Sequence, residues 1–309
     1  MSADAPAAAR RSQSAPRRRP RLTGKAIAPY LFILPNMAIF GLFTIYPAFD
    51  MINISFYDSS DGRRFKAVGT ENYAEIFSSA EFFSVALNTM LFTVAFVLLT
   101  VVASTALAVM LNDKFRGRDF FRAVIFLPTL LSAVVVGLLW GWILDRTNGL
   151  VNVMLDQIGL GQPGWLTDGN LTRWVIVAVG LWIHTGFYAL IMLSGLQGID
   201  PNVYEAAQID GAGRWRTFTQ MTWPLLRPTT LVVIILSMIS GFQAFDFIWT
   251  LTGGGPVGAT TLMVQFIYQK AFESPVRYGL ASAGAVVLFI VVFAFTVLNF
   301  LYGRRKEAA

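Results

Sequence analysis

Six long apolar stretches constrain this chain more than any other feature of its sequence. Each is long enough for a helix to cross the hydrocarbon core of a bilayer, which takes about 20 mainly apolar residues. The second and the sixth contain no charged residue. The sequence therefore predicts an all-α, polytopic membrane protein with six transmembrane helices. The stretches cover residues 27–53, 82–111, 120–144, 174–196, 229–252 and 278–302.

The composition agrees with a membrane protein and excludes several kinds of chemistry. Of 309 residues, 55% are hydrophobic and 14% are charged, whereas a soluble domain is about 25% charged. The absence of cysteine excludes disulfides, thiolate metal sites and cysteine nucleophiles. A single histidine leaves no His-rich metal cluster. We therefore expect no catalytic site, no metal and no cofactor in this chain.

Lysine and arginine are distributed unevenly among the connecting segments. Seven precede the first stretch, four follow the second, three follow the fourth and three follow the sixth, which leaves seven of 24 for the other loops. Because cytoplasmic loops carry an excess of Lys and Arg, this pattern predicts that both termini lie in the cytoplasm.

The chain divides by composition into three parts. Residues 1–24 are rich in Ala, Pro and Arg and are expected to form a disordered basic cytoplasmic tail. Residues 25–303 form the transmembrane domain, and residues 304–309 form a short cytoplasmic tail. The first apolar stretch is too long for a signal-peptide core, so it is interpreted as an uncleaved anchor with proline kinks. Anchoring also explains the basic tail without nucleic-acid binding.

The loop at 197–228 is amphipathic and is predicted to lie inside the cell. Asp200 can cap a helix whose first position suits Pro201. Gly211 suits the left-handed residue that ends such a helix. A second short helix is expected from 214 to 222, before Pro224.

This loop has two interpretations from its residues alone. Amphipathic helices in the headgroup region favour Lys and Arg on the polar face. The first helix has neither and carries Glu205 and Asp210, which offer partners to a basic group on another protein. The protein partner is therefore favoured over the lipid surface.

Three motifs stand out in the sequence. The first is Glu205-Ala206-Ala207 with Asp210-Gly211 and the distant Trp223-Pro224, and the others are LTGGGP at 251–256 and NGLVN at 148–152. Together they resemble motifs of the permease subunits of ABC importers, of the carbohydrate-uptake type that includes maltose and glycerol-phosphate permeases, and the first resembles the EAA loop of that family. The resemblance covers about residues 72–302. Trp223 departs from the pattern, since the family more often has an aliphatic residue before the proline.

The resemblance implies that the loop at 197–228 is a coupling loop, which docks on a cytoplasmic ATPase and lets it drive alternating access. It further implies a heterodimer with a second homologous permease, two ATPase copies, an extracytoplasmic solute-binding protein and a bacterial inner-membrane location. ATP and magnesium would be bound by the ATPase, since no phosphate-binding loop motif occurs in this chain. The implied coupling residues are Glu205, Ala206, Ala207, Asp210, Gly211 and Pro224.

Two spans carry candidates for a solute pathway. In the fifth, Ser237, Ser240, Gly241 and Ala244 share one helical face, which is either a packing stripe or a lining. In the fourth, the only histidine, His184, is either a satisfied core residue or part of the pathway. Counting from the motifs matches several of these positions to sugar-lining positions of maltose-type permeases. The candidates are Gly180, Ile183, His184, Phe187, Tyr188, Ser237, Ser240, Gly241, Gln243 and Ala244.

Two further features each have two interpretations from the sequence. Asp246 lies near the outer end of the fifth span and is either hydrated or paired across an interface. The external loop at 145–172 contains a segment that is either an interfacial helix or a docking surface for the solute-binding protein.

Two other classes of protein fit the sequence less well than an importer does. An ion-coupled secondary transporter needs ionisable groups in its spans and usually two matching halves, and neither is evident. A membrane enzyme needs a constellation of nucleophile, base or metal ligands. The solute itself, whether sugar, oligosaccharide, polyol or glycerol phosphate, is not determined by the sequence.

Overall fold

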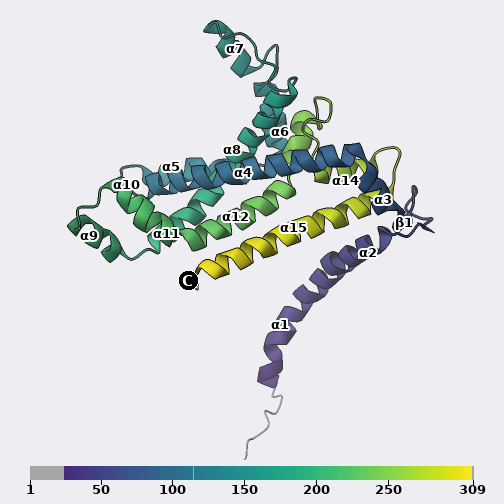
Figure 1. Cartoon of the computed structure of the whole chain (residues 1–309), viewed down its shortest axis with the longest axis horizontal. Helices are drawn as coiled ribbons and strands as arrows, with labels where there is room; N and C mark the ends of the chain where they lie inside the picture. Colours follow the sequence, from purple (N-terminus) through teal and green to yellow (C-terminus); the bar gives the residue numbers. More distant parts are fainter. Residues whose placement is uncertain (1–23, 114, 308–309) are drawn as a thin grey trace, which may run out of the picture. The chain divides into compact units, whose positions relative to one another are not determined.

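The computed structural model describes residues 24–113 and 115–307, and the predicted tail at 1–24 lies almost wholly outside them. The described residues are mainly helical, with one short antiparallel pair, β1 (Tyr57–Asp58) with β2 (Lys66–Ala67) (Figure 1). The long helices are α1 (Gly24–Phe40), α4 (Ala80–Asn112), α8 (Gly169–Gln197), α12 (Arg227–Phe242) and α15 (Tyr278–Glu307). The shorter elements are η1 (Gly41–Ile45), α2 (Tyr46–Ile54), α3 (Glu71–Ser78), α5 (Arg118–Phe126), η2 (Leu127–Leu130), α6 (Ala133–Ile143), α7 (Leu150–Gln157), α9 (Pro201–Ile209), α10 (Arg214–Thr217), η3 (Phe218–Thr222), α11 (Trp223–Leu225), α13 (Asp246–Thr252) and α14 (Met263–Phe272).

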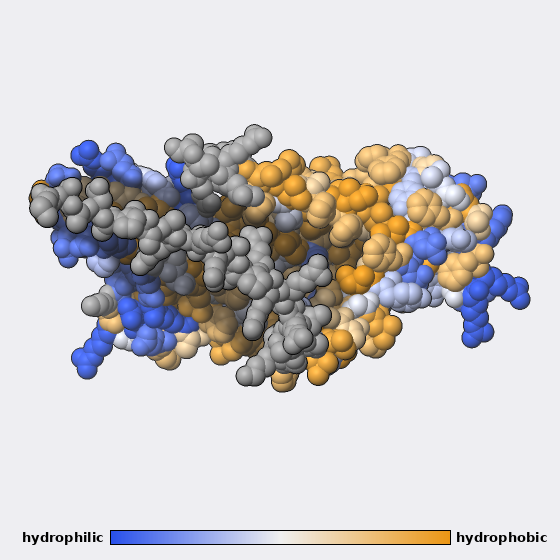
Figure 2. Space-filling view, turned by 90° about the horizontal axis from the view of Figure 1, so that it is seen from below, coloured by the Kyte–Doolittle hydropathy of each residue, from blue (hydrophilic) through white to orange (hydrophobic). Residues whose placement is uncertain are grey.

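Among the described residues, four helical segments are long and apolar enough to cross a membrane, and up to six if each of two bent helix pairs forms one span. These pairs are Arg118–Leu130 with Ala133–Ile143, bent by 98°, and Arg214–Leu225 with Arg227–Phe242, bent by 67°. Three of the four, α4, α8 and α15, match predicted stretches closely. In Figure 2, hydrophobic side chains gather between two ends at which hydrophilic ones lie. A helical membrane protein is therefore supported by length, composition and surface.

Two predicted spans are not continuous helices, which the hydropathy pattern did not indicate. In the stretch 120–144, α5 with η2 meets α6 at an angle of 98°. Pro128 lacks the N–H of a regular helix, and the backbone becomes extended at Leu131 and Ser132. In the stretch 229–252, α12 ends at Phe242 and α13 begins at Asp246. Phe245, with φ −150° and ψ −61°, is outside the helical region.

The first unit of the chain, up to Asp50, consists of α1, η1 and the start of α2. The helix widens to π form over Gly41–Ile45, in the turn before Pro47. A proline ring clashes with the carbonyl of the fourth preceding residue, and the wider turn avoids that contact. The side chains from Tyr30 onward are largely exposed, as expected for a segment that meets lipid.

The second unit, from Met51 to the C-terminus, is a helical bundle built around α4 and α8. The α4 helix packs on α8 and on α12, while α15 packs on α12 and on α14. The two broken spans meet each other, because α6 packs along α13. Gly137 makes this approach possible, since a Cβ there would overlap the Thr250 side chain.

A polar cluster fixes the end of the bundle at which α15 begins. Asn72 is buried and donates to the carbonyls of Ser55 (2.9 Å) and Tyr57 (2.8 Å). Arg277 forms a bidentate pair with Glu75 and lies 4.0 Å from Asp58. Hydrogen bonding to Glu75 raises the pKa of the Arg277 guanidinium further above its usual value. These contacts join the β1 segment, α3 and the start of α15.

The contact between α5 and α8 predicts the effect of one substitution. A Cβ at Gly186 would overlap the backbone carbonyl of Ile125, which cannot rotate away. We expect Gly186→Ala to destabilise the purified chain in detergent by about 1–3 kcal/mol, as overpacking does. Gly41→Ala is the control, because its Cβ would meet nothing within 4 Å. Retention of the monodisperse peak after heating measures the effect, and equal losses in both variants would contradict it.

Candidate functional site

The predicted helix–turn–helix of the loop at 197–228 is present. The Asp200 carboxylate accepts from the amide of Asn202 at 2.9 Å, and Pro201 occupies the first position of α9. Gly211 has a φ of +70°, which an L residue with a side chain rarely adopts. The Ala212 amide donates to the Ala207 carbonyl at 2.9 Å and closes the helix end. These local signals explain why α9 is so short and so well bounded.

The α9 helix presents a mixed surface. Glu205, Ala206, Asp210 and Gly211 are exposed, whereas Ala207 is fully buried. Two apolar residues that were not predicted to be functional are highly exposed, Ile209 at 86% and Trp215 at 77%. Exposed large apolar groups beside carboxylates are typical of a protein contact rather than of a free surface. Their position next to the EAA motif is the signal that could have identified them.

The second half of the loop connects directly to α12. After α10, the helix widens to π form over Phe218–Thr222, ahead of Pro224. The Thr222 hydroxyl lies 3.4 Å from the Tyr204 hydroxyl, which links this segment to α9. Leu226 is fully buried at the start of α12. The Tyr204–Thr222 contact and the helical segment from η3 through α11 thus connect α9 to the start of α12.

The glycine-rich motif at 251–256 forms a tight turn. Gly253 and Gly254 have φ values of +57° and +90°. A Cβ on Gly254 would clash with the side chains of Gln265 and Thr261. Gln265, which is buried, donates to the Gly253 carbonyl at 2.9 Å. The motif therefore holds α13 against the start of α14.

The NGLVN motif also holds neighbouring segments together, in this case within the loop at 145–172. Asn152 is fully buried and donates to the carbonyls of Arg146 (3.0 Å) and Pro163 (3.1 Å). Its own oxygen accepts from the Trp165 indole at 2.7 Å. The expected short helix is α7, and this asparagine ties it to the chain on either side.

The candidate pathway residues of α8 form a small network with α12 and α4. The Tyr188 and Ser240 hydroxyls are 3.0 Å apart. His184 lies between aromatic rings, with centroid distances of 5.8 Å to Phe96 and 6.3 Å to Tyr188. The histidine is half-buried, and Phe187 is 40% exposed.

Of the small residues on one face of α12, some are buried by packing and others are partly exposed. The Ser237 hydroxyl is buried and donates to the Val233 carbonyl at 2.7 Å. Gly241 packs on Thr93 of α4, where a Cβ would lie 3.0 Å from a methyl group. The buried candidates are Gly180, Ile183, Tyr188, Ser237 and Gly241, and those at least partly exposed are His184, Phe187, Ser240, Gln243 and Ala244.

The gap between α12 and α13 exposes two polar side chains. Among the described residues, neither the Gln243 amide nor the Asp246 carboxylate has a hydrogen-bonding or ionic partner. A row of rings begins beside them, with Phe245, Trp249, Tyr268 and Phe272 at centroid separations of 5.1–5.9 Å. This row was not predicted, because its members come from segments that meet only in the folded chain.

Comparison with known proteins agrees with this architecture. Residues 101–307 match the model of the family described as binding-protein-dependent transport system inner membrane component. The chain belongs to this family, the permease subunits of ABC importers, and its relatives are carbohydrate-type permeases. It is 33% identical to the trehalose/maltose transport system permease protein MalF of Thermococcus litoralis, over 90% of this chain and 94% of that protein. It is 30% identical to the sn-glycerol-3-phosphate transport system permease protein UgpA of Agrobacterium fabrum, over 91% and 96%.

Solved structures show the same fold. One is a bacterial ABC transporter involved in the import of the acidic polysaccharide alginate, with a TM-score of 0.79 and 26% identity over 91% of this chain and 98% of that chain. A second is the alginate transporter in complex with an alginate pentasaccharide-bound periplasmic protein, with a TM-score of 0.80 and 25% identity over 91% and 97%. The predicted resemblance to importer permeases is thereby confirmed.

The cap of α9 allows a direct test of the loop. We expect Asp200→Ala to remove the acceptor for the Asn202 amide and to speed hydrogen exchange of the α9 amides about fivefold, as loss of an N-cap does. Asp200→Asn keeps an acceptor and serves as the control. Exchange measured by mass spectrometry on the purified chain separates the two variants. Unchanged protection in Asp200→Ala would show that packing alone holds α9.

Proposed function

We propose that this chain is the permease subunit of an ATP-driven importer that moves a sugar or related solute into the bacterial cytoplasm by alternating access. The observation that carries the proposal is the loop at 197–228, a capped helix with exposed carboxylates and exposed apolar groups on a family-matched permease fold. A chain without a phosphate-binding loop motif needs a separate ATPase. The proposed topology has six spans with both termini in the cytoplasm, the two broken helices each counting as one.

The coupling step would use α9. Glu205 and Asp210 would pair with basic groups of an ATPase subunit, while Ala206 would permit close approach and Ile209 and Trp215 would bury apolar area. Ala207 and Gly211 would act by closing and bounding the helix, as their burial and positive φ indicate. Pro224 would set the connection to α12. Movement of α9 would reach the spans through the Tyr204–Thr222 contact and Leu226.

The solute would pass along α8 and α12 toward a second permease subunit. The exposed candidates there combine rings with polar groups, which suits a sugar with its apolar face and many hydroxyls. Gln243, Asp246 and the aromatic row at the gap between α12 and α13 extend this surface. The buried candidates Gly180, Ile183, Ser237 and Gly241 would shape the pathway by allowing close packing. Tyr188 would orient Ser240.

A solute-binding protein would deliver the sugar to the side of the membrane on which the loop at 145–172 lies. The alginate transporter was solved with a substrate-bound periplasmic protein, which supports a partner of this kind for a chain with the same fold. The second permease and two ATPase copies complete the proposed assembly. An ion-coupled secondary transporter would require neither partner.

Charge reversal in α9 tests the coupling role. We expect Glu205→Arg to reduce co-purification of an ATPase subunit from native membranes about tenfold or more, since it places like charges together at the contact. Asp113→Arg reverses an exposed carboxylate in another loop predicted to be cytoplasmic and is the control. Mass spectrometry identifies the co-purified subunits. Isolation of the wild-type chain alone, or full ATPase recovery with Glu205→Arg, would contradict the proposal.

Substitution in α8 tests the pathway. A strain lacking this chain is first compared with wild type for uptake of maltose, trehalose, lactose and glycerol 3-phosphate, and the affected solute is then used. We expect His184→Ala to raise the KM for that solute about fivefold, as loss of one hydrogen bond does. Ser194→Ala, which removes an exposed hydroxyl from the same helix, is the control. An unchanged KM with His184→Ala would place the histidine outside the pathway.

A further inference from the structure

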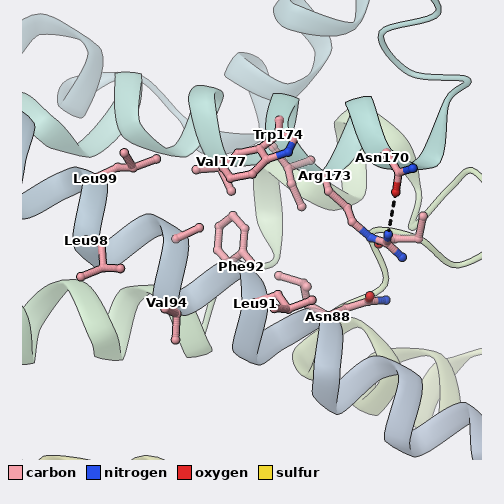
Figure 3. A pocket seen from close by; sticks show the side chains of 14 residues that line it. Asn88, Leu91, Phe92, Val94, Leu98, Leu99, Asn170, Arg173, Trp174 and Val177 are labelled. Atoms are coloured by element: carbon pink, nitrogen blue, oxygen red, sulfur yellow. Dashed lines mark hydrogen bonds between the residues drawn. The ribbon is translucent and has the colours of Figure 1, made fainter.

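A groove on the surface of the bundle lies between α4 and α8, away from the residues considered so far. Its volume is about 600 Å³. Figure 3 shows Asn170 and Arg173 at one end and Leu98 and Leu99 at the other, with Phe92 between them. The groove therefore has one polar end and a long apolar remainder. The apolar lining also includes Leu91, Val94, Ala95, Trp174, Ile176, Val177, Ala259 and Leu262.

Arg173, at the polar end of the groove, uses only some of its N–H donors in hydrogen bonds to the described residues. Its Nε donates to the Ala259 carbonyl at 3.2 Å and its Nη1 to the Asn170 side chain at 3.2 Å. A guanidinium has five N–H donors, so three remain. Among the described residues, no carboxylate lies within 4.0 Å of this group. An exposed cation without a counter-charge favours an anionic ligand.

The dimensions of the groove match those of one lipid leaflet. From Asn88 to Leu99 the lining follows 12 residues of α4. The 11 steps between them cover about 16 Å at 1.5 Å per residue. Half of a bilayer core is about 15 Å deep. Trp174, 62% exposed beside Arg173, belongs to the residue type that marks the membrane–water interface. These features fit a groove whose polar end is at headgroup level and whose apolar part is in the hydrocarbon.

We propose that this groove binds an anionic phospholipid, with its phosphate on Arg173 and one acyl chain along Leu91, Val94 and Leu98. The charge and the shape together favour this occupant. A helix from a second permease is the alternative occupant of the apolar part, and it would exclude lipid from Leu98. The lipid would brace α4 against α8 at the turn that contains Ala259. This inference does not depend on which solute is transported.

Lipid titration with native mass spectrometry tests the headgroup contact. The assembly purified through the full-length chain is titrated with palmitoyl-oleoyl phosphatidylglycerol, the matching phosphatidylcholine and free glycerol phosphate. We expect phosphatidylglycerol to bind, Arg173→Ala to weaken it about fivefold, and Arg173→Lys to weaken it less, since charge contributes at the surface. Arg63→Ala, an exposed arginine outside the groove, should have no effect. Equal binding to wild type and Arg173→Ala, or equal binding of free glycerol phosphate, would overturn the proposal.

Two further variants test the acyl-chain contact independently of Arg173. Val94→Trp fills the groove from an exposed position and should reduce phosphatidylglycerol binding by at least about twofold. Because the chain has no cysteine, Leu98→Cys gives a single site for a fluorescent label. Brominated phosphatidylglycerol should quench that label more strongly than brominated phosphatidylcholine. Equal quenching by the two lipids, or no quenching by either, would show that another occupant covers the groove.

Discussion

Hydrocarbon offers no hydrogen-bond partners to the backbone, and this constraint governs the whole structure. Regular helices satisfy it without help, as α4, α8 and α15 do. Hydroxyl groups inside the helices donate to carbonyls of the preceding turn, as Thr89 does to Val85 at 2.8 Å. Interruptions are tolerated only where protein covers them. At the first break, the Thr129 hydroxyl donates to the Ile183 carbonyl at 2.8 Å and joins the irregular segment to α8.

The two helices that follow the interruptions pack on each other. The α6 helix follows one break and α13 follows the other, and their contact is close because Gly137 has no side chain. Beyond α13, the glycine turn at 251–256 and the buried Gln265 hold α14 in place. The outcome is a paired unit of half-helices beside the continuous helices of the bundle. In the proposed alternating-access mechanism, such a unit would shift against its neighbours without unwinding a complete span.

Much of this architecture could be predicted because its signals are local. Hydropathy located the continuous helices to within a few residues, and Asp200, Pro201 and Gly211 bounded α9. The breaks were not predicted, because hydropathy averaged over a span of about 20 residues does not register a change in backbone conformation confined to a few residues, such as 131–132 or 243–245. The face carrying Ser237 and Gly241 was recognised, but spacing cannot tell which neighbour a face meets, and the structure places Thr93 against it. The row of rings from Phe245 to Phe272 could not be predicted, because its members come from segments that meet only in the folded chain.

The loop at 197–228 also explains why a charged segment is retained next to apolar helices. Its carboxylates would be costly in lipid, and together with the exposed apolar groups they suit a contact with another protein. The segment is short and capped, so its own backbone needs are satisfied without burial. Through η3 it joins α12, and α12 ends at the gap that leads to α13. In the proposed coupling mechanism, a displacement of α9 would be transmitted along this connection to the gap at residues 243–245, where the helix is already interrupted.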